Sequence, residues 1–178
     1  MVKFDWDWNS TESKGNEDYK RLISGGYVCR ITKAEDNSEK QYIYMEFDIS
    51  EGEFTGYGAS CLERNGFTPL KMFRSYTDKA AGMFKGFVEC LNQSNPNSPA
   101  WDFDEAHLVG KWIGIVLGEE EYKKQDGTIK TRFYVKRTVT PASIRSGNFK
   151  VPDLKKLPVE QNTAAFTPMD DDDGDLPF

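Results

Sequence analysis

Alternating apolar and polar positions predict a β-rich protein. Residues 41–49 alternate most regularly, and every second side chain in them is apolar: Ile43, Met45, Phe47 and Ile49. The side chains between these are expected to face the solvent: Tyr42, Tyr44, Glu46 and Asp48. Residues 26–34 alternate in the same way, with Tyr27, Cys29 and Ile31 on one side. Because the polar residues 36–40 separate the two runs, we expect an antiparallel hairpin.

The middle of the chain predicts one bent strand and one helix. Residues 50–76 contain scattered aromatic residues and several glycines, which suggests a third strand near 54–62 that resumes near 70–76. Residues 77–95 then have helical periodicity, since their apolar side chains form one stripe: Met83, Phe84, Phe87, Val88 and Leu91. The expected N-cap of this helix is Thr77 or Asp78.

Two more strands are predicted within residues 110–140, on either side of a turn at Asp126 and Gly127. An Asp-Gly pair between alternating runs is a strong hairpin signal. Pro141 is expected to begin one helical turn within residues 141–149. From Lys150 onward the composition is typical of a linker, because Pro, Lys, Gln, Asn and Thr predominate.

Five strands with a helix between the third and the fourth is the order of the OB-fold, a Greek-key barrel that binds oligonucleotides. We therefore predict a mainly β, OB-fold-like five-stranded barrel at residues 26–149. An N-terminal extension (1–25) precedes it, and a linker (150–169) and a flexible acidic tip (170–178) follow it. The ligand-binding loops of such a fold would lie near residues 36–40 and 123–128. A generic α+β sheet is the alternative, because one sequence does not prove the spatial order of strands.

Acidic residues are concentrated at the end of the chain. The net charge of the 178 residues is -6, and five aspartates lie within residues 170–175. Without these five aspartates the net charge would be -1, so the body is nearly neutral and can present a basic face. This asymmetry is typical of an interaction tail.

The cysteines and the absence of targeting segments indicate a cytoplasmic protein. Cys29, Cys61 and Cys90 share no CxxC spacing, so we expect reduced thiols that pack like other small apolar side chains. The sequence has no apolar run of about 18 residues and no basic and apolar leader at Met1. We therefore expect neither a membrane span nor secretion.

Cations and aromatic side chains interleave on the predicted solvent-facing side of the strands. This combination suits a single nucleic-acid strand, because cations contact phosphates and rings stack on unpaired bases. The predicted stacking residues are Tyr42, Tyr44, Trp112 and Tyr134. The predicted phosphate contacts are Arg30, Lys71, Arg74, Lys111, Lys130, Arg132 and Lys136. Such residues also occur on ordinary exposed strands, and Glu46, Asp48 and residues 119–121 oppose a uniformly basic groove.

The sequence contains no recognisable catalytic arrangement. His107 is the only histidine, and no Walker loop, GxGxxG or HExxH motif occurs. Asp102, Asp104 and Glu105 could hold a divalent cation, but a cap at the start of a helix is the favoured interpretation. We therefore predict a protein that is not an enzyme and that needs no metal or other cofactor.

The ending "DDDDGDLPF" resembles the acidic tip of bacterial single-stranded DNA-binding proteins. The matching residues are Asp171, Asp172, Asp173, Asp175, Leu176, Pro177 and Phe178. Gly174 interrupts the acids, and Leu176 stands where isoleucine is usual. The resemblance implies that the tip docks onto proteins of replication, recombination and repair, with Phe178 in an apolar pocket and its terminal carboxylate paired with an arginine. It also implies that the tip competes with DNA for the basic face of its own chain.

The middle of the chain resembles early proteins of bacteriophages and prophages of Gram-positive bacteria, which are encoded in replication and recombination modules. The segments that carry this resemblance are "FDISEGEF", "PLKMFRSYTDKAAGMFKGF", "GEEEY", "DGTIKTRFYVKR" and "FKVPDLKKL". It covers residues 26–157. It implies a phage-encoded single-strand binder with an OB core, in the cytoplasm of an infected or lysogenic host.

The leading hypothesis is therefore a sequence-nonspecific single-stranded DNA-binding protein that recruits partners through its tip. One alternative is an adaptor or inhibitor that binds a host replication or recombination protein and no DNA. Another is a small metal-dependent nuclease that uses the Asp102, Asp104 and Glu105 cluster. A homo-oligomer is compatible with the sequence. Phe4, Trp6 and Trp8 could add a strand to the barrel, form a dimer contact or stack on bases.

Overall fold

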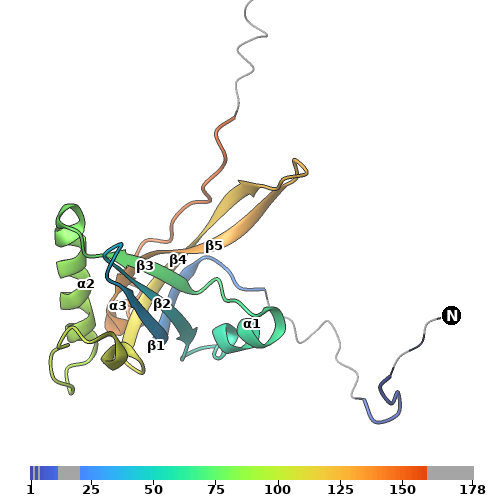
Figure 1. Ribbon diagram of the computed structural model, residues 1–178, viewed down its shortest axis with the longest axis horizontal. Helices are drawn as coiled ribbons and strands as arrows, with labels where there is room; N and C mark the ends of the chain where they lie inside the picture. The colour runs from blue at the N-terminus through green and yellow to red at the C-terminus, as the bar shows by residue number, and fades with distance from the viewer. Residues whose placement is uncertain (2, 4, 12–20, 160–178) are drawn as a thin grey trace, which may run out of the picture.

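The protein folds around one five-stranded antiparallel sheet with the strand order β3-β2-β1-β4-β5 (Figure 1). The computed structural model describes residues 1, 3, 5–11 and 21–159. The strands are β1 (Gly25–Asn37), β2 (Tyr42–Ile49), β3 (Lys71–Ser75), β4 (Trp112–Lys123) and β5 (Ile129–Val139). The helices are α1 (Tyr57–Asn65), α2 (Ala81–Ser94) and α3 (Pro141–Arg145), with short 3-10 turns at Asp78–Ala80 and Glu105–Leu108. In this described part, no helix has the length and apolar character of a membrane span.

The predicted alternation of β2 is confirmed on its apolar side. Its four apolar side chains are buried: Ile43, Met45, Phe47 and Ile49. Cys29 and Ile31 of β1 are buried opposite Ile49 and Phe47, because directly paired residues of an antiparallel ladder project from the same face. β1 is the central strand, and its first half pairs with β4 from Gly25 opposite Leu117 to Arg30 opposite Trp112.

The predicted strand at residues 54–62 is wrong, because residues 57–65 form the helix α1. Glycines with positive φ lie at both ends of this helix, Gly56 (φ 82°) before it and Gly66 (φ 77°) after it. The N–H of Gly66 donates to the carbonyl of Leu62, which closes the last turn. Cys61 is buried on the side of α1 that faces the sheet. The strand predicted near 70–76 is confirmed as β3.

The helix between the third and fourth strands is confirmed as α2, but its predicted apolar stripe is only partly right. Phe87 and Leu91 are buried in the core, and Phe84 and Val88 pack against it. Met83 is 68% exposed and belongs to the solvent side of the helix. The predicted turn after Pro141 is also confirmed, as α3, where Thr140 accepts from the Ser143 N–H.

The β4–β5 hairpin is long, and its outer half extends away from the helices (Figure 1). Phe133 and Val135 of β5 pack against the core. Thr131, two residues before Phe133, is exposed because it lies on the extended half of the hairpin.

Two segments outside the predicted barrel pack against it. Leu22, assigned to the N-terminal extension, is fully buried in the core. Lys155, assigned to the linker, pairs with β4, since its N–H donates to the Glu119 carbonyl at 3.0 Å and its carbonyl accepts from the Glu121 N–H at 2.8 Å. The described cysteines are all free thiols, and Cys29 and Cys61 are buried, as expected for packing residues.

Candidate nucleic-acid interface

One face of the sheet brings together five of the predicted site residues. Trp112 pairs with Arg30, and Arg30 pairs with Asp48 on β2. Tyr44 lies on the same side of β2 as Asp48 and pairs with Phe73 of β3. We call this side of the sheet the aromatic–basic face. The predicted site residues on it are Arg30, Tyr42, Tyr44, Lys71 and Trp112.

Three rings form a continuous cluster at the β2–β3 end of the aromatic–basic face. The Phe73 ring lies 5.3 Å from the Tyr42 ring and 5.0 Å from the Tyr44 ring, between centroids. Phe73 is 59% exposed, although it is a large apolar residue in the middle of a strand. These rings and Lys71 line a shallow groove of about 380 Å³, whose other wall is residues 35–37. The groove therefore offers ring faces to a ligand.

The charges around this ring cluster are mixed. The Lys33 ammonium lies 5.8 Å from the Tyr44 ring and 3.1 Å from a Glu35 carboxylate oxygen. Glu46 was predicted to face the solvent, but it is only 8% exposed, because its carboxylate lies against Tyr44 and accepts from the Tyr44 hydroxyl at 2.7 Å. Burial, together with this hydrogen bond, raises the pKa of Tyr44, so the ring carries a neutral hydroxyl.

Arg30 and Trp112 form a second aromatic and basic unit on the same face. The Arg30 guanidinium lies 4.2 Å from the Trp112 ring centroid, within the range of a cation–π interaction. The Trp112 backbone is held by Asn95 at the end of α2. Its N–H donates to the Asn95 side-chain oxygen at 2.9 Å, and its carbonyl accepts from the Asn95 amide at 2.9 Å. Arg30 is exposed.

The predicted residues of β5 form a separate group on the hairpin. Arg132 donates to Glu120 at 2.8 Å, and its guanidinium lies 5.3 Å from the Tyr122 ring. The Lys155 ammonium lies 4.7 Å from the Tyr134 ring centroid. Arg132 and Tyr134 thus contact other side chains of the protein, and Arg132 is exposed all the same. Lys130 and Lys136 are exposed as well.

Arg74 and Lys111 do not lie with the ring cluster. Arg74 pairs with Ile43, on the side of β3 that faces the core, and its guanidinium lies 5.9 Å from the Phe87 ring. Burial lowers the pKa of Arg74. Lys111 lies just before β4, where its carbonyl accepts from the Ile31 N–H at 3.0 Å.

Sequence reasoning missed Phe73 and Lys33. Phe73 could have been found from the two-residue period of β3, which places it on the same side as Lys71 and places Arg74 on the other side. Lys33 was hidden by a β-bulge, since the register of β1 against β2 shifts between Ile31 and Lys33. Because of this bulge, the alternation of apolar and polar residues does not predict on which side of the sheet Lys33 lies.

The cluster at residues 102–107 is engaged in local contacts. Asp104 caps the 3-10 turn by accepting from the Ala106 N–H at 2.9 Å, as the capping interpretation predicted. An Asp102 carboxylate oxygen lies 2.9 Å from Nδ1 of His107, and this hydrogen bond lowers the pKa of Asp102. Within the described residues, no three His, Cys, Asp or Glu side chains converge as metal ligands would.

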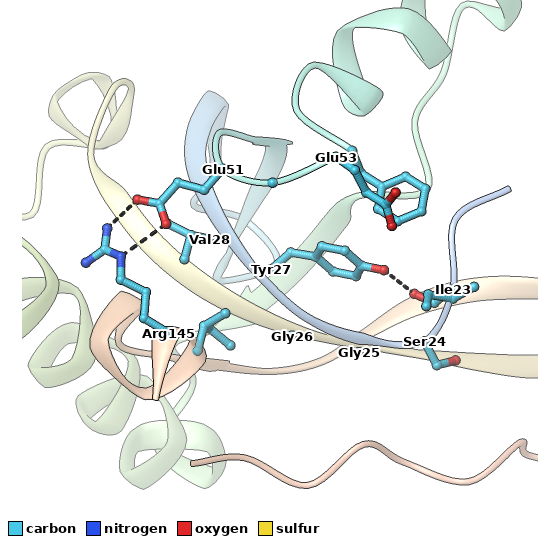
Figure 2. Close-up of a pocket in the computed structure, with 12 residues that line it drawn as sticks. Ile23, Ser24, Gly25, Gly26, Tyr27, Val28, Glu51, Glu53 and Arg145 are labelled. Carbon is cyan, nitrogen blue, oxygen red and sulfur yellow. Dashed lines mark hydrogen bonds and ion pairs between the residues drawn. The ribbon is translucent and has the colours of Figure 1, made fainter. Parts of the chain in front are cut away.

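A cavity of about 430 Å³ lies between the start of β1, the loop after β2 and α3 (Figure 2). Figure 2 shows Arg145 reaching Glu51, and the Arg145 Nε donates to a Glu51 oxygen at 3.1 Å. The Tyr27 hydroxyl donates to the Ile23 carbonyl at 2.5 Å. These three polar side chains pair within the protein, so they hold the walls of the cavity together.

The predicted docking tip lies outside the described residues, together with Phe4. The residues concerned are Asp171, Asp172, Asp173, Asp175, Leu176, Pro177 and Phe178. Trp6 and Trp8 are described, and their rings stack with centroids 5.7 Å apart. No protein-family model matches the chain, and no curated protein is significantly similar to it in sequence.

Proposed function

We propose that the chain is a sequence-nonspecific, non-enzymatic single-stranded DNA-binding protein of phage replication or recombination. The observation that carries this proposal is the ring cluster of Tyr42, Tyr44 and Phe73 on an open sheet face. Lys71 lies beside it, and Arg30 with Trp112 extends it across β1 and β4. Rings stack on bases of any sequence and cations contact phosphates, so this surface suits an unpaired strand.

We also propose that the sheet is an OB-like barrel. The order β3-β2-β1-β4-β5, with α2 between β3 and β4, supports this proposal. The edge strands β3 and β5 come within 8 Å of each other between Cα atoms, which is the approach that closure of such a barrel requires. In this arrangement the ring cluster lies on the second and third strands, the face on which OB-folds bind oligonucleotides.

The test is a titration of fluorescent single-stranded oligonucleotides of several sequences with the full chain, at two salt concentrations, with and without magnesium. We expect binding that tolerates sequence changes, weakens with salt and causes no cleavage. Phe73→Ala should weaken binding roughly 5- to 100-fold, which corresponds to the loss of one base stack.

Phe67→Ala is the matched control, because Phe67 is a similarly exposed phenylalanine outside the aromatic–basic face. Equal effects of the two substitutions would contradict a role for the ring cluster. Absence of binding by the unmodified chain would favour the adaptor hypothesis. Magnesium-dependent cutting would favour a nuclease.

We further propose that the acidic tip recruits replication or recombination proteins of the host. The resemblance of residues 171–178 to the tips of bacterial single-stranded DNA-binding proteins supports this step, as does the concentration of acid at the end of the chain. The tip and the ring cluster would then divide the two activities, since one binds proteins and the other binds DNA.

A further inference from the structure

A third pocket, which shares only Asp36 with the groove at the ring cluster, is built from aromatic walls and two carboxylates. It has a volume of about 210 Å³ and lies between the end of β1, the start of β2, the residue after β3, α2, and the loop and 3-10 turn before β4. Its lining residues are Asp36, Ile43, Tyr76, Phe84, Trp101, Phe103 and Glu105. We call it the acidic aromatic pocket. Ligand pockets commonly measure about 300–1,000 Å³, so this pocket has the size for one side chain rather than a larger molecule.

The aromatic walls form a continuous row. The Phe84 ring lies 5.8 Å from the Tyr76 ring and 6.2 Å from the Trp101 ring, and the Trp101 ring lies 5.2 Å from the Phe103 ring. Trp101 is fixed in place because its indole N–H donates to the Asp104 carbonyl at 2.7 Å. The pocket therefore presents ring surfaces that are held before any ligand arrives.

Phe103 has an unusual backbone for its position in this pocket. Its φ is 68°, in the left-handed region that bulky residues seldom adopt, and its side chain is 66% exposed. An exposed phenylalanine in a strained conformation adds little to the stability of the fold. Strain of this kind is often retained where a side chain serves a ligand.

The two carboxylates give the acidic aromatic pocket a negative potential. One Asp36 oxygen accepts from the Tyr76 hydroxyl at 2.7 Å, and a carboxylate has a second oxygen that can accept from a ligand. Glu105 is half-buried beside the same ring. The hydrogen bond to Asp36, and the charges of both carboxylates, raise the pKa of Tyr76. The residues that line the pocket include no cation.

We propose that the acidic aromatic pocket binds the guanidinium group of an arginine from a partner protein. A cation over aromatic rings gains a cation–π interaction, and a carboxylate beside it adds charge-assisted hydrogen bonds. A guanidinium suits this pocket better than an ammonium, because its planar fork can stack on a ring and donate to both carboxylates. Two carboxylates and no cation line this pocket, so a cationic side chain suits it better than a phosphate. The groove at the ring cluster shares Asp36 but differs in that Lys71 lines it as well. This inference does not depend on the proposed DNA binding.

The experiment titrates the full chain with three blocked peptides that differ only in a central arginine, lysine or citrulline. Binding is followed through the NMR signals of the Trp101 indole N–H and the Phe103 amide. We expect the arginine peptide to shift both signals to saturation, the lysine peptide to bind more weakly, and the uncharged citrulline peptide to leave them unchanged. Equal binding of citrulline or of lysine, or no binding of arginine, would overturn the assignment.

Substitutions in the acidic aromatic pocket complete the test. Glu105→Gln and Asp36→Asn should each weaken binding of the arginine peptide roughly tenfold, and Glu63→Gln, an exposed carboxylate on α1, should not. Phe103→Gly should also weaken binding without lowering the thermal midpoint, because glycine tolerates a positive φ. Unchanged binding in all three pocket variants would overturn the proposal. Shifts that depend on protein concentration without peptide would identify a second copy as the occupant instead.

Discussion

At the scale of single residues, the ion pair of Glu51 and Arg145 joins two segments that are distant in the chain. Glu51 follows β2, and Arg145 is the last residue of α3. The hydrogen bond from Arg145 lowers the pKa of the Glu51 carboxyl below its ordinary value of 4.5. Because the folded-state pKa is depressed, the stabilisation is fully present above 4.5 and is lost as the pH falls through the lowered value.

We therefore expect Glu51→Gln to lower the urea midpoint of unfolding at neutral pH and to have no effect in acid below the folded-state pKa. The loss should be small, because both side chains are exposed to water. Urea unfolding at the two pH values measures this loss, with Glu63→Gln as the control for removing the charge of an exposed glutamate. A difference that persists in acid would contradict the ion-pair explanation.

Individual site residues were predictable from the sequence where strand alternation was unbroken. Tyr42 and Tyr44 follow the alternation of β2, and the structure places them together on one face. Glu46 departs from this prediction, since its burial depends on a hydrogen bond to the Tyr44 hydroxyl that no periodic pattern encodes. Arg74 lies apart because a cation on a short strand can pack over a core ring, here Phe87, as well as face water.

At the scale of elements, α1 docks on β2 through a glycine. A Cβ atom at Gly58 would lie 2.6 Å from the Phe47 carbonyl oxygen, and the Gly58 N–H donates to Asp48 at 2.7 Å. Since the nearest atom belongs to the backbone of β2, which is paired with a strand on each side, it has little room to move. The sequence pattern did not predict this helix, because its apolar face is short and its two boundaries depend on glycines that also suit a curved strand.

We expect Gly58→Ala to destabilise the fold by about 1–3 kcal/mol through overpacking against β2. Gly86→Ala is the matched control, because Gly86 lies inside α2 with no atom within 4 Å of the added methyl group. The control should stabilise the protein by roughly 0.5–1 kcal/mol, since alanine favours helices. Urea unfolding checks both variants, and a neutral Gly58→Ala would show that α1 is not held by this contact.

At the scale of the whole molecule, the tip at residues 170–178 is strongly acidic, whereas the rest of the chain is nearly neutral. The proposed competition between tip and DNA predicts that deletion of these residues tightens binding of single-stranded DNA at low salt. The proposed docking predicts that the same deletion abolishes capture of host replication or recombination proteins. Both effects are measurable with the full chain and the truncated chain side by side.

Two further variants separate these effects. Phe178→Ala retains all five aspartates of residues 170–175, so it should abolish partner capture and leave DNA affinity unchanged. Exchanging the five aspartates for asparagine should tighten DNA binding by itself. Partner capture that survives both deletion and Phe178→Ala would refute the docking role of the tip.

The number of strands and their succession along the chain could be predicted from the sequence, because turns such as Asp126–Gly127 and long alternating runs are local signals. The packing of Leu22 and of Lys155 could not be predicted from the sequence. Leu22 fills a position in the core and Lys155 pairs with β4, and both sites exist only in the assembled sheet. For the same reason, the sequence did not indicate the acidic aromatic pocket. Its walls come from β1, β2, α2 and two connecting segments that no single periodicity connects.

The central position of β1 has a consequence for the order of events in folding. Strands β1 to β3 are close in sequence, and β4 and β5 form a hairpin, so each group can form by itself. The pairing of β1 with β4 joins segments far apart in the chain and closes a large loop, which makes it the slow step. In pulsed hydrogen exchange during refolding, the amides of Ile113 and Ile115 should therefore become protected later than those of Met45 and Phe47. Simultaneous protection would show that both halves assemble in one step.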